Sequence, residues 1–141
     1  TELRPDAVLC VGQYGGANCI RVERVAISLR DARIADNAGK QPTDERSWPE
    51  VRMPICDDPD AGDRRRLREQ GIPAQLSYSA GTFVCNDLLY CALHESERSN
   101  PAPRCALSTS LTSEQTKDGN APSMGLEMMV KALHIAVEAI A

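Results

Sequence analysis

A junction between a strand and a helix lies in the run Ser77-Tyr78-Ser79-Ala80-Gly81-Thr82-Phe83-Val84-Cys85-Asn86. Residues 74–79 are predicted to form the strand, and Gly81 breaks the chain after it. Residues 83–93 have helical character, because their apolar side chains share one face of a helix. The run therefore predicts a strand, a glycine turn and a helix that carries a cysteine in its first turn.

Other segments upstream and downstream extend this alternation. Residues 7–11 form a nearly continuous apolar run that ends in Gly12. Such a run predicts a buried strand that is covered on both faces, as in a parallel sheet. Strand-like segments also lie at 22–29 and 106–109, whereas residues 31–50 are polar and predict a long loop.

Two further helices are predicted. The first covers residues 64–70 and ends at Gly71. The second is C-terminal, with Ser123 as its N-cap and Glu127 in its first turn. Its apolar residues follow the spacing of an amphipathic helix, namely Leu126, Met129, Val130, Leu133, Val137 and Ile140. Strands that alternate with helices predict an α/β fold, a three-layer sandwich with a largely parallel central sheet, as one domain over residues 1–141.

Composition excludes several classes of protein. The chain has 141 residues, of which 42% are hydrophobic, and this is enough for a core and too many for a disordered chain. The net charge of -4 argues against nucleic acids and anionic membranes as partners, since both require a basic face. We find no apolar run that could span a bilayer and no signal-peptide pattern, and therefore predict a cytoplasmic protein.

The spacing of the six cysteines indicates neither a disulfide framework nor a metal site. They are Cys10, Cys19, Cys56, Cys85, Cys91 and Cys105. No CxxC pair is present, and neither histidine stands at metal-ligand spacing from a cysteine. The chain is also neither small nor loop-rich. Most of these thiols are therefore expected to be small buried groups, with at most one or two of them reactive.

Cys85 is the candidate for reactivity. The start of a helix carries a partial positive charge and unpaired N–H groups, which would lower the pKa of a thiol and could hold an oxyanion. A buried structural cysteine at such a junction is the alternative. The residues alone leave both interpretations open.

The run 79–86 closely resembles the nucleophile signature of the pyroglutamyl peptidase I family, also called pyrrolidone-carboxylate peptidases. Other blocks match the family in the same order along nearly the whole chain. They are Val11-Gly12-Gln13, Gly15-Gly16, residues 22–27, Ala32-Arg33-Ile34, Asp36-Asn37, Gly39, Gln41-Pro42, residues 71–74, Glu114-Gln115 and Pro122-Ser123-Met124. By this resemblance the chain is identified as a member of the family.

The resemblance implies roles for five residues. Cys85 matches the nucleophile, and Glu23 matches the carboxylate that orients the catalytic base. Gln13 and Phe83 match positions that line the pocket for the lactam ring of pyroglutamate. Arg33 matches a motif arginine near the active site. The implied reaction is removal of an N-terminal pyroglutamyl residue from peptides through a thioester, by a homotetramer that needs no metal or cofactor.

Each role has an alternative when the residues are read alone. Glu23 could form a structural ion pair with Arg24 or with another arginine. Phe83, the only phenylalanine of the chain, could be an ordinary core residue.

The sequence departs from the family pattern at the base. The family has a histidine a few residues before its Pro-Glu-Gln run, and counting back from Glu114 places Ser108 there. A serine cannot accept the proton of a thiol near neutral pH. His94 lies roughly 13 Å along the same helix from Cys85, beyond hydrogen-bond reach of the thiol. Family members often have a histidine near this position, and the resemblance implies that His94 is a packing residue. His134 is predicted to lie at the surface.

The chain also begins after the segment that opens the family pattern. That segment holds a strand, a loop with glycine and phenylalanine, and a helix. The resemblance therefore implies the C-terminal two-thirds of the family domain, without its first strand and helix.

Three hypotheses follow from these features. The chain is a divergent cysteine peptidase that uses Cys85 and Glu23, or an inactive relative that binds ligands or joins an oligomer, or a fragment without a function of its own. Turnover that depends on Cys85 would favour the first, and binding of pyroglutamate without turnover would favour the second.

Overall fold

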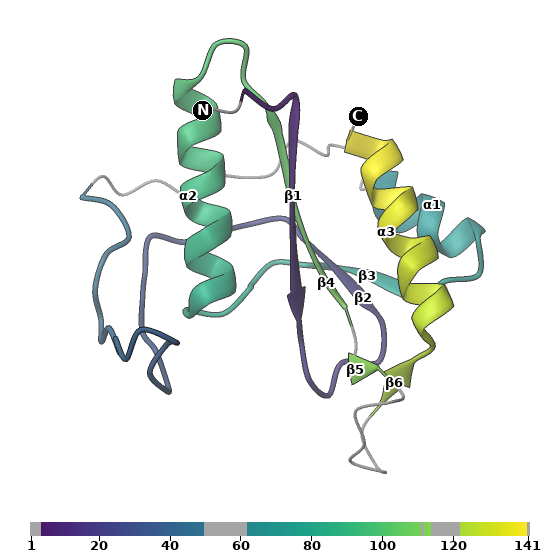
Figure 1. The fold of residues 1–141 in the computed structure, drawn as a ribbon, viewed down its shortest axis with the longest axis horizontal. Helices are drawn as coiled ribbons and strands as arrows, with labels where there is room; N and C mark the ends of the chain where they lie inside the picture. Colours follow the sequence, from purple (N-terminus) through teal and green to yellow (C-terminus); the bar gives the residue numbers. More distant parts are fainter. Residues whose placement is uncertain (1–3, 50–61, 111, 114–121, 141) are drawn as a thin grey trace.

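A computed structural model describes residues 4–49, 62–110, 112–113 and 122–140 (Figure 1). The elements follow one another along the chain as β1 (Ala7–Gln13), β2 (Ile20–Glu23), α1 (Gly62–Glu69), β3 (Ala74–Ser77), α2 (Val84–Arg98), β4 (Arg104–Ser110), β5 (Thr112–Ser113), β6 (Ser123–Met124) and α3 (Leu126–Ile140). The predicted strand, glycine turn and helix are present as β3, a turn with Gly81 at φ +79°, and α2. Cys56 and Glu114-Gln115 lie outside the described residues.

The central sheet has the strand order β1-β4-β2-β3. Strands β1 and β4 are parallel, as are β2 and β3, whereas the middle pair, β2 and β4, is antiparallel. The prediction of a largely parallel sheet is therefore confirmed, with one antiparallel pair between the two parallel ones. Strands β5 and β6 form a separate parallel pair.

Helices cover the sheet on both faces, which confirms the three-layer α/β sandwich. Figure 1 shows α2 on one side of the sheet, and α1 with α3 on the other. Two buried clusters match these two interfaces. The cluster under α2, here called the α2-face cluster, contains Cys10, Ala26, Leu89, Tyr90 and Leu93. The cluster under α1 and α3 contains Ile20, Val22, Leu67, Ile72, Ala74, Met124 and Ala132.

Strand β1 is less buried than its apolar run predicts. Only Cys10 of this strand is buried, and Val11 is 50% exposed. In the described part of the chain β1 pairs with β4 alone and forms one edge of the sheet. The strand contacts both α2 and α3, so helices lie on both of its faces as predicted, and its partial exposure goes with its position at the edge of the sheet.

Helix α1 ends where the sequence predicts. Gly71 follows it in the left-handed region, with φ +74°, a conformation that glycine adopts at little cost. The N–H of Ile72 donates to the carbonyl of Leu67, which closes the last turn. Leu67 is 1% exposed and anchors this charged helix to the sheet.

The start of α3 differs from the prediction. Ser123 belongs to β6 and is not an N-cap, since the helix begins at Leu126. The carbonyl of Gly125 accepts the first helical hydrogen bond, from the N–H of Met129. The chain uses Ser123 for pairing with Thr112 in β5, and this pairing keeps it out of the helix.

Candidate active site

Cys85 is the second residue of α2, as predicted. The residue before the helix, Phe83, is extended at φ -111° and makes no side-chain capping bond. The first N–H groups of a helix have no partner within it, so they remain available near the thiol. Cys85 is half-buried and packs against the α2-face cluster.

The pKa of Cys85 moves in the direction opposite to the prediction. Burial raises the pKa of the thiol, and the nearby carboxylate of Glu23 raises it further. Burial and a neighbouring anion both disfavour a thiolate. The expectation of a lowered pKa was therefore wrong, because it took account of the helix start but not of desolvation.

Two further thiols lie at the α2-face cluster against which Cys85 packs. Cys10 belongs to the α2-face cluster, and Cys105 packs against it with Sγ 3.5 Å from the carbonyl oxygen of Ala92. Burial raises the pKa of Cys10, and the thiols of Cys105 and Cys85 add to this effect. The described cysteines, Cys10, Cys19, Cys85, Cys91 and Cys105, are all free.

Glu23 is the last residue of β2 and is only 2% exposed. Its Oε1 lies 3.3 Å from Nε of Arg21. The structural ion pair considered from the sequence is therefore present, with Arg21 as the partner. The structure also brings Glu23 near Cys85, as the raised pKa of that thiol indicates.

Arg21 is held by several groups besides Glu23. One terminal nitrogen donates to the hydroxyl of Ser77 and, at 2.9 Å, to the carbonyl of Ser79. The guanidinium also lies over the ring of Tyr14, 4.4 Å from its centroid. Arg21 thus connects β2 to the end of β3 and to the loop after β1.

The strand register gives the place of Ser108. Residue 108 of β4 lies opposite Val11 of β1 and Val22 of β2. Glu23 lies opposite residue 107. The assignment of Ser108 to the base position remains a prediction from the sequence.

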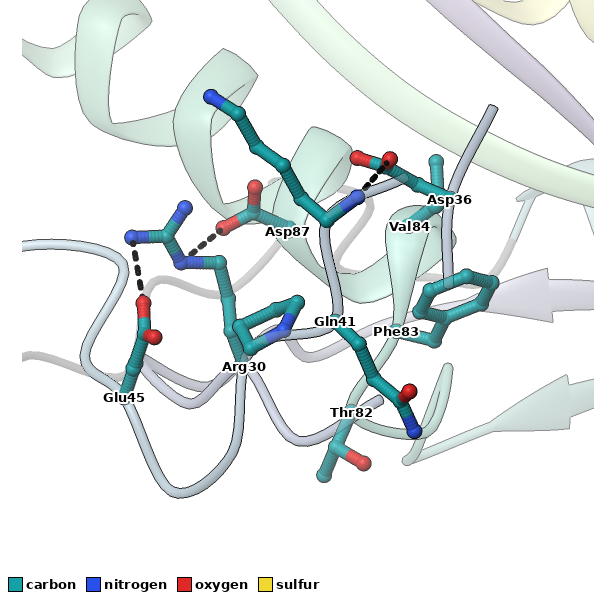
Figure 2. A pocket seen from close by; sticks show the side chains of 10 residues that line it. Arg30, Asp36, Gln41, Glu45, Thr82, Phe83, Val84 and Asp87 are labelled. Carbon is teal, nitrogen blue, oxygen red and sulfur yellow. Dashed lines mark hydrogen bonds and ion pairs between the residues drawn. The ribbon is translucent and has the colours of Figure 1, made fainter. Parts of the chain in front are cut away.

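A pocket of about 500 Å³ opens beside the start of α2 (Figure 2). Its lining comes from α2, from the turn before it and from the polar segment at residues 30–45, here called the excursion. The lining residues are Arg30, Asp36, Lys40, Gln41, Pro42, Glu45, Thr82, Phe83, Val84 and Asp87. The guanidinium of Arg30 reaches two carboxylates, Oε2 of Glu45 at 3.7 Å and Oδ1 of Asp87 at 3.8 Å. The lining of the pocket therefore combines the apolar ring of Phe83 with charged side chains of both signs.

Hydrogen bonds fix the excursion beside this pocket. The N–H of Asp31 donates to the carbonyl of Thr82, and the hydroxyl of Thr82 donates to the carbonyl of Asp31, both at 2.8 Å. Asn86 bonds to the backbone of Ile27 and Leu29 from the first turn of α2. The sequence did not indicate Arg30 or Asp87 as pocket residues. They are 57 positions apart in the chain, and only the folding of the excursion against α2 brings them together.

The three residues predicted to bind substrate differ in whether they line this pocket. Phe83 lines the pocket, whereas Gln13 and Arg33 do not. Gln13 is exposed at the end of β1, and Arg33 is exposed on the excursion. Of the three, Phe83 alone lies both at the pocket and at the start of α2.

The two histidines have the positions that the sequence predicts. His94 is buried and stacks on Trp48, with ring centroids 4.6 Å apart. His134 is exposed on α3. Among the residues that the structure describes, no group of His, Cys, Asp and Glu side chains could hold a metal ion. No helix in that part of the chain is long and apolar enough to cross a membrane.

Comparison with known proteins gives one family. The family model described as pyroglutamyl peptidase matches residues 1–141. The pyrrolidone-carboxylate peptidase of Bacillus subtilis is 44% identical over 140 residues, and the match covers 94% of this chain and 63% of that protein. Its counterpart from Bacillus cereus strain ATCC 10987 is 38% identical and is covered to 65%. The chain thus spans slightly less than two-thirds of the length of these relatives.

Solved structures agree with this result. The crystal structure of pyroglutamyl peptidase I from Bacillus amyloliquefaciens superposes with a TM-score of 0.90 at 40% identity, and the match covers 96% of this chain and 66% of that one. Pyrrolidone carboxyl peptidase from Thermococcus litoralis gives a TM-score of 0.92 at 33% identity, with 96% and 66% of the two chains covered.

Proposed function

This chain belongs to the pyroglutamyl peptidase family, and from that premise we propose that it acts on peptides with an N-terminal pyroglutamyl residue through Cys85. The observation that carries the proposal is the placement of Cys85. The thiol lies in the first turn of α2, near the buried carboxylate of Glu23, and Phe83 two residues earlier lines a pocket.

The proposed reaction forms and breaks one thioester. Sulfur of Cys85 attacks the carbonyl carbon of the pyroglutamyl residue, and a C–S bond replaces the C–N bond to the next residue. The N–H groups at the start of α2 are available for the oxyanion. The leaving amine takes up a proton, and water then cleaves the thioester to pyroglutamate and the free thiol.

The proton of the Cys85 thiol controls the rate of this reaction. The raised pKa of Cys85 means that the thiol stays protonated at neutral pH. Both histidines lie away from it, one stacked on Trp48 and one exposed on α3. We therefore expect slow turnover near pH 7 that increases as the pH approaches the pKa of this thiol.

The test is turnover of a fluorogenic pyroglutamyl amide between pH 7 and 10. Cys85→Ala should abolish the signal at every pH, while the parent rate should increase with pH. Cys91→Ala is the matched control, because it removes another half-buried thiol of the same helix. A parent rate equal to that of Cys85→Ala at every pH would overturn peptidase activity.

A second candidate function is binding without turnover. The ion pair between Arg21 and Glu23 favours it, since a carboxylate held by an arginine is not free to orient a base. Calorimetric titration with a pyroglutamyl peptide would then give binding that Phe83→Ala weakens. The same peptide starting with proline, which lacks the lactam carbonyl, is the control ligand.

We further propose that the chain works in the cytoplasm without a cofactor, as a homo-oligomer such as a homotetramer, and without nucleic acid or membrane as a partner. Exposed apolar side chains on α3 support the oligomer, namely Leu126, Met128, Val130 and Val137. Light scattering after size-exclusion chromatography measures the mass directly, and a monomer at micromolar concentration would contradict the oligomer.

A further inference from the structure

The pocket at the start of α2 lies beside Cys85 and not around it (Figure 2). Cys85 packs against the α2-face cluster, toward the sheet, whereas Phe83, Val84 and Asp87 line the pocket. Successive residues of a helix point about 100° apart, so positions 84 and 87 share a side of the first turn that position 85 does not. A peptide whose carbonyl carbon meets the sulfur of Cys85 therefore reaches the pocket with an adjoining part of its chain.

The two sides of this pocket differ in chemistry. Figure 2 shows the ring of Phe83 on one side, and on the other the guanidinium of Arg30 beside the carboxylates of Glu45 and Asp87. A lactam ring is small and neutral, so it suits the aromatic side and fills only part of a pocket of about 500 Å³. The charged side is left for the residue that follows pyroglutamate in the peptide.

The charged side holds more negative than positive charge. Oε2 of Glu45 and Oδ1 of Asp87 lie 3.7 and 3.8 Å from nitrogens of Arg30, which is too long for a hydrogen bond. Carboxylate oxygens offer several acceptor positions, so both groups can still bind a second cation. The other charged lining residues, Asp36 and Lys40, have opposite signs and leave this excess of carboxylate unchanged.

Backbone hydrogen bonds hold the charged side in place independently of its charges. The N–H of Arg30 donates to the carbonyl of Glu45 at 2.7 Å, and the N–H of Glu45 donates back to the carbonyl of Arg30 at 3.0 Å. Asn86 connects α2 to the backbone of Ile27 and Leu29, just before Arg30. Neutralising one charged side chain should therefore change the charge of the pocket more than its shape.

We propose that the charged side of the pocket, formed by Arg30, Glu45 and Asp87, is the subsite for the residue that follows pyroglutamate, and that it favours a basic side chain there. The inference rests on the proposed function, because only a peptide attacked at Cys85 brings its second residue to this place. A lysine or arginine of the peptide would meet carboxylates that Arg30 neutralises only in part, whereas an acidic side chain would be repelled.

The test compares three peptides that differ only in the second residue. They are pyroglutamyl-lysyl-alanine amide and its glutaminyl and glutamyl counterparts, and the released dipeptide amide is measured by chromatography. Turnover is followed at pH 9, where the thiol is more reactive and lysine keeps its charge. We expect kcat/KM for the lysyl peptide to exceed that for the glutamyl peptide by roughly 5-fold, as for a charge contact at partly exposed positions. High salt should reduce this ratio.

Two variants should move the ratio in opposite directions. Asp87→Asn removes one carboxylate and should bring the ratio close to one, whereas Arg30→Gln removes the cation and should increase the ratio. A loss of stability would not produce opposite shifts. Glu95→Gln is the matched control, because it removes the same charge from an exposed position of α2 about two turns beyond Asp87 and should keep the parent ratio. Glu45→Gln serves in place of Asp87→Asn if that variant does not fold.

A binding measurement separates this inference from peptidase activity. Calorimetric titration of Cys85→Ala with the same peptides reads the subsite without turnover. If the parent shows no turnover, tighter binding of the lysyl peptide to Cys85→Ala, lost when Asp87→Asn is added, would support the subsite and reject the peptidase. Equal Kd values, or no measurable binding, would then overturn the subsite.

If the parent does show turnover that depends on Cys85, the ratio of kcat/KM values decides. Equal values for the lysyl and glutamyl peptides would overturn the subsite while the peptidase stands. A lysyl preference that Asp87→Asn and Glu45→Gln both leave unchanged would overturn it as well.

Discussion

Helices α2 and α3 are each 15 residues long, yet they dock on the sheet in different ways. Helix α2 buries large side chains, with Leu89 and Tyr90 both at 0% exposure. Helix α3 is richer in apolar residues but buries only Ala132 and Ala136 completely. Large apolar residues of α3 remain on its outer side, namely Leu126, Met128, Val130 and Val137.

The difference shows that apolar content does not determine how firmly a helix is fixed. Helix α2 carries Cys85, and it is fixed by large buried side chains together with the polar contacts of Asn86. Helix α3 buries two small alanines, and its larger side chains at this contact, Met129 and Ile135, are only partly buried, so it buries less bulk than α2. Substitutions on the two helices therefore test this comparison.

The largest effect is expected at Leu89. Replacement by alanine removes a fully buried side chain and leaves a cavity, which should lower the free energy of unfolding by about 2–5 kcal/mol. Leu126→Ala on α3, where the leucine is 57% exposed, should change it by no more than about 0.5 kcal/mol. Urea unfolding of both variants measures the two values. Similar losses would mean that α3 is as firmly anchored as α2.

Asn86→Ala should have the next largest effect. The amide is 1% exposed, accepts from the N–H of Ile27 and donates to the carbonyls of Ile27 and Leu29. Its loss leaves buried backbone groups without partners, at a cost of about 1–3 kcal/mol. The exposed Asn37, changed to alanine, is the control in the same denaturation experiment. An equal midpoint for the two variants would show that the excursion does not depend on α2.

Ala132→Leu tests the close approach of α3. Position 132 is 4% exposed, and added bulk there must displace the helix or the sheet, at about 1–3 kcal/mol. Glu138→Leu adds an apolar side chain at an exposed position of the same helix and should be nearly neutral. A stabilised Ala132→Leu variant would instead reveal unfilled space under α3.

A smaller effect is expected from pH. Burial raises the pKa of Cys10, Cys85 and Cys105 in the folded state. A folded state that holds its protons more tightly than the unfolded chain loses stability as the pH rises above the unfolded pKa of a thiol, about 8.5. The free energy of unfolding should therefore be constant below that pH and decrease as the pH rises through the folded pKa values. Cys85→Ala should reduce this slope, and an unchanged slope would contradict the raised pKa of that thiol.

Much of the fold could be predicted from local patterns. The strand, glycine turn and helix around Cys85 follow from residues that are neighbours in sequence, and so does the end of α1 at Gly71. The exposed side of α3 was not predicted, because an amphipathic stripe is expected to face the core, whereas Leu126, Val130 and Val137 of that stripe are exposed. Burial of the two alanines depends on how near the sheet lies.

The site was predictable only in part for a similar reason. Cys85, Glu23 and Phe83 are candidates that resemblance to a family pattern predicts, while the ion pairs of Arg21 and Arg30 depend on how the chain folds.

The reciprocal hydrogen bonds between Asp31 and Thr82 have a consequence for local opening of the chain. They join the excursion to the turn that leads into α2, and Asn86 repeats the connection one turn of helix later. Amide protons that share such bonds exchange with solvent as one cooperative group. The N–H groups of Ile27 and Asp31 should therefore exchange at a common rate, so that the pocket wall and the start of α2 open together or not at all.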